Sequence, residues 1–154
     1  MSTVDIEFLQ GWVGSTETHC DVISVAPVAG LSASLDYLSP LAQVGEALPP
    51  GWHWLYFQDA AAASKLAIDG HVRRGNFMPP VPLSRRMWAG GRLRFFSPVT
   101  IGDEVRRVST IASITHKEGR SGALIFVTLS HQIFQQDKLA IEEEQNLVYR
   151  DYGT

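Results

Sequence analysis

The sequence predicts a single α+β domain in which a long antiparallel sheet follows one main helical region. Residues 90–105 alternate as a strand, a turn at Gly102-Asp103 and a second strand. Two further strand-like runs follow almost without a break. Before them, apolar residues recur at spacings of three and four from Ser24 onward, which is the period of a helix. A length of 154 residues suits one domain, here residues 1–154.

Two helices are expected in the first third of the chain. The first covers residues 3–13 and carries an apolar stripe. A polar break at 14–19 and a short strand at 21–23 follow it. The second helix begins after Ser24, which serves as its N-cap. One face of this helix is expected to point into the protein and contains Val28, Leu31, Leu35 and Leu38.

The rest of the chain is expected to be mainly β. The aromatic run at 52–57 predicts a strand. Residues 58–86 form a long connection with a short helix near 60–67, and connections of this length are often functional. Four long strands then complete the sheet, at 87–97, 103–117, 122–136 and 138–150.

Composition indicates a folded globular protein, with 45% hydrophobic and 19% charged residues. No apolar run approaches the roughly 18 residues of a membrane span, and the first residues lack the basic start of a secretory signal. We therefore expect a cytoplasmic protein that does not act at a membrane. The single cysteine, Cys20, cannot form an internal disulfide and is expected to be a buried thiol. No metal site is expected, because no ligand spacing links His19, His71, His116 and His131.

Positive charge is concentrated in the middle of the chain, although the net charge is −3. Residues 1–70 contain eight acidic residues and one lysine, whereas residues 71–107 contain eight arginines and two acidic residues. Guanidinium groups bind phosphate through paired hydrogen bonds and stack on flat rings, so a nucleotide or phosphopantetheine ligand would suit this cluster. Alternatively, the arginines form a solvated surface paired with acids elsewhere. The negative net charge and the lack of a reader motif argue against nucleic acid.

Three stretches carry a resemblance to a known family: LPPGWHWLYF at 48–57, PLSRRMWAGG at 82–91 and EEEQNLVYR at 142–150. With the strands between them, most of residues 20–150 resembles the MaoC-like dehydratase superfamily. The resemblance is to the N-terminal half of the mesaconyl-CoA hydratases and type 2 hydroxyacyl-thioester dehydratases. It implies a hot-dog fold, a long antiparallel sheet wrapped around a central helix. It also implies reversible addition of water to an enoyl-CoA or enoyl-carrier-protein thioester, without a cofactor.

The catalytic motif of that superfamily, Asp-x-Asn-Pro-x-His, has only a partial counterpart here. With one extra residue allowed, Asp36 falls at the Asp position and Pro40 at the Pro position, but Ala42 occupies the His position. Hydration needs both an acid and a base, and alanine cannot transfer a proton. The resemblance therefore implies a subunit without a complete dyad, which needs a partner with the intact motif. Alternatively, Asp36 or His53 acts as the catalytic group. Asp36 could equally be a solvent-exposed acid, and His53 a packed histidine.

Four further residues are expected to bind substrate. Arg85 and Arg86 flank Trp88 and suit the phosphates of the ligand, while Trp54 and Trp88 suit an aromatic wall beside a pantetheine arm. The tryptophans could instead pack in the core or at a dimer interface. On the last strand, Glu143 faces opposite to its two acidic neighbours, and we expect a salt bridge to the arginine cluster.

The resemblance also bears on assembly. The family joins two hot dogs into one extended sheet, and this chain has the length of one. Because open sheet edges tend to be paired or covered, we expect a homodimer or a heterodimer with a second hot-dog subunit. Two alternative functions remain: a non-catalytic subunit that binds acyl-CoA or scaffolds a partner, and a hot-dog thioesterase.

Overall fold

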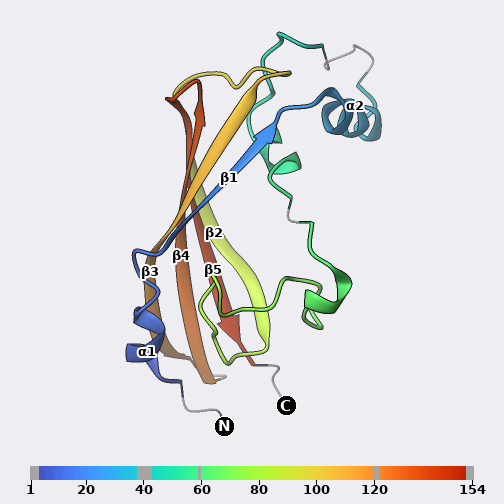
Figure 1. Cartoon of the computed structure of the whole chain (residues 1–154). Helices are drawn as coiled ribbons and strands as arrows, with labels where there is room; N and C mark the ends of the chain where they lie inside the picture. Colours follow the sequence, from blue (N-terminus) through green and yellow to red (C-terminus); the bar gives the residue numbers. More distant parts are fainter. Residues whose placement is uncertain (1–3, 38–42, 59, 120–121, 152–154) are drawn as a thin grey trace.

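One five-stranded sheet dominates the protein (Figure 1). The computed structural model describes residues 4–37, 43–58, 60–119 and 122–151. The strand order is β1-β3-β4-β5-β2, and every neighbouring pair is antiparallel. The strands are β1 (Thr16–Val22), β2 (Arg85–Phe95), β3 (Glu104–Gly119), β4 (Gly122–Gln135) and β5 (Lys138–Arg150). The helices are α1 (Ile6–Gln10), α2 (Val25–Ser34) and the 3-10 turns η1 (Trp52–Leu55) and η2 (Ala63–Lys65).

This architecture confirms the α+β class, and the four long strands end within two residues of their expected limits. The alternation of apolar residues predicts these strands well because one face of the sheet is buried. A two-residue turn joins β4 to β5, with Gln136 and Asp137 both at positive φ (50° and 58°). Such a turn matches the right-handed twist of the strands that it connects. None of the helices in the described ranges is long and apolar enough to cross a membrane.

The first strand is longer than its sequence suggests. β1 takes in four residues of the expected polar break, and its side chains alternate between exposed and half-buried. An edge strand with a polar outer face gives only a weak hydrophobic pattern, which is why the sequence shows little of it. The prediction of a buried Cys20 was wrong, because this alternation places the thiol on the exposed side of β1.

Helix α2 lies beside one end of the sheet, next to η1, as Figure 1 shows. Its Val28 is fully buried in the core cluster at that end of the sheet. The helix ends at Ser34, so Leu35 is its C-cap and is 54% exposed. The expected inward face therefore holds for Val28 but was wrong for Leu35, which lies past the last helical residue and is exposed. Leu38, expected on the same face, lies outside the described residues.

The aromatic run forms η1, so the prediction of a strand at 52–57 was wrong. Gly51, at φ 87°, opens the turn, and local hydrogen bonds close it, such as that from Tyr56 N to His53 O (3.1 Å). Aromatic residues favour buried positions as well as strands, and in this stretch they accompany a partly buried turn rather than a strand. The tight turn buries His53 (3% exposed) and leaves Trp54 half-exposed.

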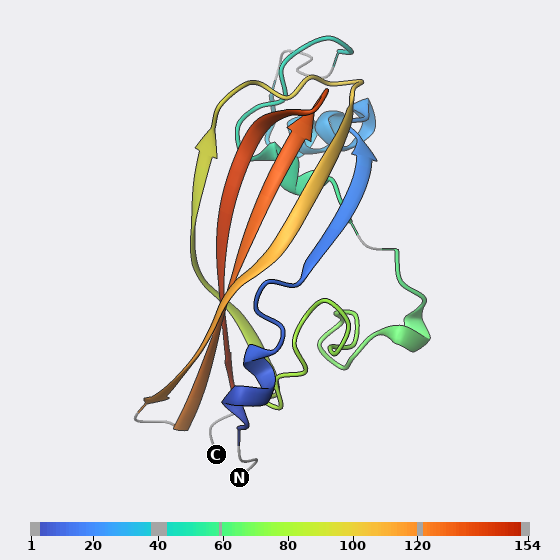
Figure 2. The same ribbon diagram turned by 60° about the vertical axis from the view of Figure 1, so that its left-hand side comes forward.

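Two core clusters share one face of the sheet. One lies near α2 and η1 and includes Ile23, Val105 and Ile133. The other lies towards α1 and includes Ile111 and Leu129. Figure 2, a second view, shows α2, η1 and the connection that follows them on the same side of the sheet. The opposite face carries charged pairs, such as Arg94 with Glu142 on neighbouring strands (3.3 Å).

The long connection is held to the sheet by Arg74. Its Nη1 donates to the carbonyl oxygens of Val81 (2.7 Å) and Leu83 (2.6 Å), and its guanidinium covers the ring of Tyr149. Within the sheet, β2 and β5 approach closely at Gly91, where a Cβ atom would lie 2.7 Å from a backbone oxygen of β5. These two contacts fix the connection and β2, which together form part of the site described below.

Candidate functional site

A belt of polar side chains crosses the buried face of the sheet between the two apolar clusters. This polar belt comprises Arg107 and Ser109 on β3, His131 on β4, and Glu143 and Gln145 on β5. The register places Ser109 beside His131 and His131 beside Glu143, so these three side chains lie in one row across the strands. Above and below this level the same faces of the strands are apolar, as with Ile133 and Leu129 on β4.

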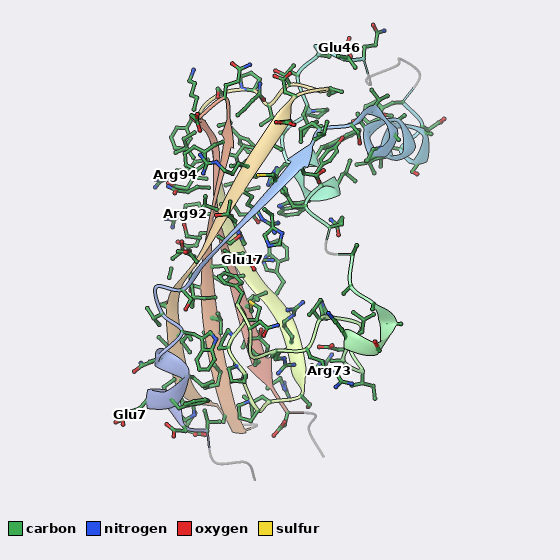
Figure 3. All side chains as sticks on the ribbon, viewed as in Figure 1. Glu7, Glu17, Glu46, Arg73, Arg92 and Arg94 are labelled. Carbon is green, nitrogen blue, oxygen red and sulfur yellow. The ribbon has the colours of Figure 1, made fainter. Side chains whose placement is uncertain are left out.

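A cavity of about 570 Å³ lies over the polar belt. Its walls come from the sheet, from η1 and from the long connection, which contributes residues such as Phe77 and Met78. Figure 3 labels Glu17, which lines the cavity from β1, and Arg92 and Arg94, which project from the other side of the sheet. A cavity of this size suits a small ligand or the reactive end of a larger one. Its polar wall residues are Glu17, His53, Gln58, His71, Arg86, Arg107, His131, Glu143 and Gln145.

The best-connected group in the cavity is Glu143. Its Oε2 lies 3.2 Å from His53 Nε2 and accepts a hydrogen bond from Trp54 Nε1 at 3.1 Å. Burial works against ionisation of this carboxyl, but the hydrogen bonds from His53 and Trp54 outweigh it and hold the pKa of Glu143 below its usual range. An ionised Glu143 thus fixes both η1 side chains on the sheet.

His131 lies beside Glu143 and is almost fully buried. Its Nδ1 is 2.8 Å from Ser109 Oγ, and its Nε2 is 3.4 Å from Gln145 Oε1. Burial lowers the pKa of His131, and the positive charge of Arg107 adds to that effect, although Glu143 opposes it. The ring is therefore neutral at physiological pH.

Arg107 is the unpaired cation of the belt. Its Nε is buried without a hydrogen-bond partner, and its guanidinium stacks over the ring of Phe57 (4.9 Å to the centroid). No carboxylate in the part of the chain that the structure describes forms an ion pair with it. The side chain as a whole is half-buried, so the desolvation cost falls on the Nε atom rather than on the entire guanidinium.

Two tryptophans and an arginine form a further wall. The rings of Trp54 and Trp88 meet edge-to-face, with centroids 6.1 Å apart, and both side chains are more than half exposed. Arg86, from β2, lines the same cavity. Exposed aromatic rings beside a cation offer a surface for a flat or extended ligand.

Four of the six predicted site residues lie together, since His53, Trp54, Arg86 and Trp88 all line the cavity. Arg85 is exposed and does not line the cavity. Neighbouring residues of a strand point to opposite faces, so Arg85 points away from the face that carries Arg86.

Asp36 lies apart from this cavity. It follows α2 and is exposed, with a left-handed backbone (φ 57°). Pro40 and Ala42, the rest of the partial catalytic motif, lie outside the described residues.

The expected salt bridge to the arginine cluster is made by Glu142 and not by Glu143. Glu143 alternates with its neighbours as predicted, but its carboxylate pairs with His53 rather than with the arginine cluster. The arginine pair belongs instead to Glu142, on the opposite face. The sequence did contain one signal for this site: a polar residue at a position where an otherwise apolar strand is buried. The same signal identifies His131 and Ser109.

The site thus combines hydrogen-bond acceptors, a neutral imidazole and an unpaired guanidinium in one partly enclosed cavity. These groups can orient a polar ligand and can hold or move a proton. Among the described residues, no three His, Cys, Asp or Glu side chains are grouped so as to hold a metal ion.

Comparisons with known proteins point to one family. The hydroxyacyl-thioester dehydratase type 2 family matches residues 51–153. The chain is 48% identical over 142 residues to the mesaconyl-C(4)-CoA hydratase of Chloroflexus aurantiacus, covering 92% of this chain and 51% of that protein. It is 28% identical over 157 residues to the mitochondrial hydroxyacyl-thioester dehydratase type 2 of Schizosaccharomyces pombe, covering 84% and 52%. The chain therefore spans about half the length of the curated relatives it matches.

Solved structures share the fold. The ChsH1-ChsH2 complex from Mycobacterium tuberculosis gives a TM-score of 0.68 at 10% identity, covering 95% of this chain and 94% of that one. The HadBC 3R-hydroxyacyl-ACP dehydratase complex from the same organism gives 0.58 at 16% identity, covering 88% and 96%. These likenesses confirm the expected hot-dog architecture.

Proposed function

Because the chain belongs to the hydroxyacyl-thioester dehydratase type 2 family, we propose that it is one hot-dog subunit of a hydratase that reversibly adds water to an enoyl thioester. The observation that carries this proposal is the 48% identity to a mesaconyl-CoA hydratase over 92% of the chain. The reaction needs no redox chemistry, and we propose that no cofactor takes part.

The cavity over the polar belt is the proposed thioester site. Trp54 and Trp88 supply an apolar wall for the pantetheine arm, and Arg86 supplies a cation for a phosphate. Glu143 supports this wall, because it holds Trp54 through a charge-assisted hydrogen bond. In this proposal Arg85, which is exposed outside the cavity, contributes only to the surface charge around it.

The acid–base pair for hydration is proposed to come from a partner subunit. Asp36 is exposed outside the cavity, which argues against its acting on a bound thioester. His53 is the alternative catalytic group, since it lies in the cavity wall and is oriented by a carboxylate. Its Nδ1 is buried and lacks a partner, so it would have to become accessible before it could accept a proton from water.

The partner is proposed to dock at the free edge of β2, an eleven-residue strand at the end of the sheet. Edge strands of this length present a row of unpaired backbone groups, which invites pairing with another sheet. Exposed aromatic rings lie on or next to this edge: Trp54 is 51% exposed, Trp88 62%, Phe95 46% and Phe96 56%. A second hot-dog subunit, identical or different, would cover them.

The test is a hydration assay on the purified chain, alone and mixed with a second hot-dog subunit that has the intact Asp-x-Asn-Pro-x-His motif. We expect the mixture to hydrate crotonyl-CoA or mesaconyl-CoA, with loss of the enoyl absorbance, and the isolated chain to be inactive. Absence of turnover in both settings would contradict the proposal. Release of free thiol instead of hydration would indicate a thioesterase.

Variants separate the two sources of the acid–base pair. Asp36→Ala is expected to leave turnover of the mixture unchanged, because Asp36 lies outside the cavity. His53→Gln tests the alternative. If the isolated chain hydrates the thioester and this change abolishes that activity, catalysis is assigned to His53. Light scattering completes the test, and a stable monomer in the active mixture would exclude the proposed docking.

A further inference from the structure

The imidazole of His131 lines the cavity and is held in one orientation from both sides. Its Nδ1 lies towards β3, 2.8 Å from Oγ of Ser109, which is itself fully buried. Its Nε2 lies towards β5, 3.4 Å from Oε1 of Gln145. A buried ring held by its neighbours on two strands is already oriented before a ligand binds.

The surroundings of the ring assign its proton to Nε2. The amide oxygen of Gln145 can only accept a hydrogen bond, so Nε2 donates, and Nδ1 accepts from the hydroxyl of Ser109. The charges nearby favour the same arrangement, because Glu143 lies on the β5 side of the ring and Arg107 on the β3 side. A negative charge attracts the N–H and a positive charge repels it. His131 is therefore a neutral hydrogen-bond donor.

This donor can exchange its present acceptor for a better one. The distance of 3.4 Å from Nε2 to Gln145 is longer than the usual range of about 2.7–3.2 Å, so the bond is weak. By contrast, the N–H groups of His53 and Trp54 on the same cavity are already bonded to the ionised Glu143. A carbonyl oxygen that enters the cavity can thus replace Gln145 at little cost.

We propose that the Nε2–H of His131 donates a hydrogen bond to the carbonyl oxygen of the thioester, and that Ser109 is the positioning residue that holds the ring through Nδ1. This inference rests on the proposed function, because it takes the cavity to be the thioester site. It adds a group on this chain that contacts the reacting part of the substrate.

The chemistry of hydration gives this hydrogen bond a role. Water adds its oxygen to the β-carbon and gives up a proton to the base, while the electron pair of the double bond moves onto the thioester carbonyl oxygen. Protonation of the α-carbon by the acid then restores the carbonyl. A donor already aimed at this oxygen stabilises the negative charge that develops there. His131 transfers no proton in these steps, so the acid–base pair can still come from a partner subunit.

The neutral state of the ring is part of this role. An imidazolium beside the ionised Glu143 would pair with that carboxylate rather than with a ligand. Burial lowers the pKa of His131 and so keeps the ring neutral.

The experiment follows the carbonyl directly, with 2,4-hexadienoyl-CoA as the probe. The absorption band of this conjugated thioester moves to longer wavelength when its carbonyl oxygen accepts a hydrogen bond. We expect this shift when the probe binds to the wild-type chain, and loss of the shift in His131→Leu, which has no donor. His131→Gln retains an N–H donor and should keep part of the shift. His116→Leu, at an exposed histidine of β3, is the matched control and should keep all of it.

Ser109→Ala tests the positioning role. Without the hydroxyl, Nδ1 loses its donor and the ring is free to turn or to change tautomer, so the shift should be smaller than in wild type. A merely structural role would lower stability and leave the shift of the bound probe unchanged. In the active mixture, His131→Leu should lower kcat by about a hundredfold with little change in KM, because the hydrogen bond strengthens in the transition state.

Each other outcome overturns the inference in an identifiable way. A full shift in His131→Leu means that the ring does not contact the carbonyl, and loss of the shift in Arg107→Met instead would assign the carbonyl to that guanidinium. If His131→Leu does not fold, Ser109→Ala decides, and a full shift there contradicts the inference. Failure of the proposed function looks different. The wild-type chain would then bind no probe, whereas binding without a shift contradicts this inference alone.

Discussion

Replacement of Glu143 by leucine tests the pairing that shapes the site. The carboxylate holds His53 at 3.2 Å and Trp54 at 3.1 Å, and its own side chain is 11% exposed. Without it, the buried Nε2 of His53 has no acceptor, and a buried donor left unpaired costs about 1–3 kcal/mol. Trp54 is half exposed, so its N–H can turn to water at little cost. We expect Glu143→Leu to lower the free energy of unfolding by about 2 kcal/mol.

A double-mutant cycle with His53→Phe isolates the pair. His53→Phe leaves the carboxylate buried with one partner fewer, whereas the double variant removes both polar groups together. The two changes should therefore cost less together than the sum of their separate costs, with a coupling of about 1–3 kcal/mol. Urea unfolding followed by circular dichroism gives each free energy.

Glu142→Leu is the control for this cycle, because Glu142 pairs with Arg94 on the exposed face of the same strand. Its loss should cost about 1 kcal/mol or less. Costs of His53→Phe and Glu143→Leu that simply add, within about 0.5 kcal/mol, would refute the reasoning that the two side chains stabilise each other.

Three further predictions concern the frame of the site, each measured by urea unfolding. Arg74→Met should lower the free energy of unfolding by about 2–3 kcal/mol, since three carbonyl oxygens lose their donor. The matched change at the exposed Arg73, Arg73→Met, should cost under about 0.5 kcal/mol. Gly91→Ala should lower the free energy of unfolding by about 1–3 kcal/mol, because the added Cβ would meet a backbone oxygen. Gly90→Ala should have no such cost, because nothing lies within 4 Å of its added Cβ. Equal costs for the two changes would contradict this prediction. Stability should fall as the pH drops below about 6.5, because His131 takes up a proton in the unfolded chain before it does so in the folded one. His131→Gln should flatten that part of the pH profile, and an unchanged slope would be evidence against the assignment.

The sheet could be predicted from the sequence because one buried face imposes a period of two on each long strand. β4 shows this most clearly, with Ile125, Val127, Leu129 and Ile133 on one face. The edge strand β1 was largely missed, since its outward residues are polar and its inward ones are half-buried. The η1 turn was missed because aromatic residues report burial without specifying the backbone that achieves it.

The site could be predicted only in part. His53, Trp54, Arg86 and Trp88 were identified from stretches of sequence that resemble the family, and they line one cavity. The pairing of His53 with Glu143 spans 90 positions, so local patterns cannot reveal it. Arg107 shows the same limit. Its charge is visible in the sequence, but the lack of a partner depends on which side chains the fold brings near it.

Direct binding of a thioester tests the central claim, that the cavity over the polar belt holds the acyl thioester. Crotonyl-CoA is titrated into the protein while tryptophan fluorescence is followed, with wild type compared to the variant Trp54→Leu/Trp88→Leu. The account predicts a saturable change in wild type that the variant loses, since both rings line the cavity. No saturable change in wild type, or the same change in the variant, would contradict it.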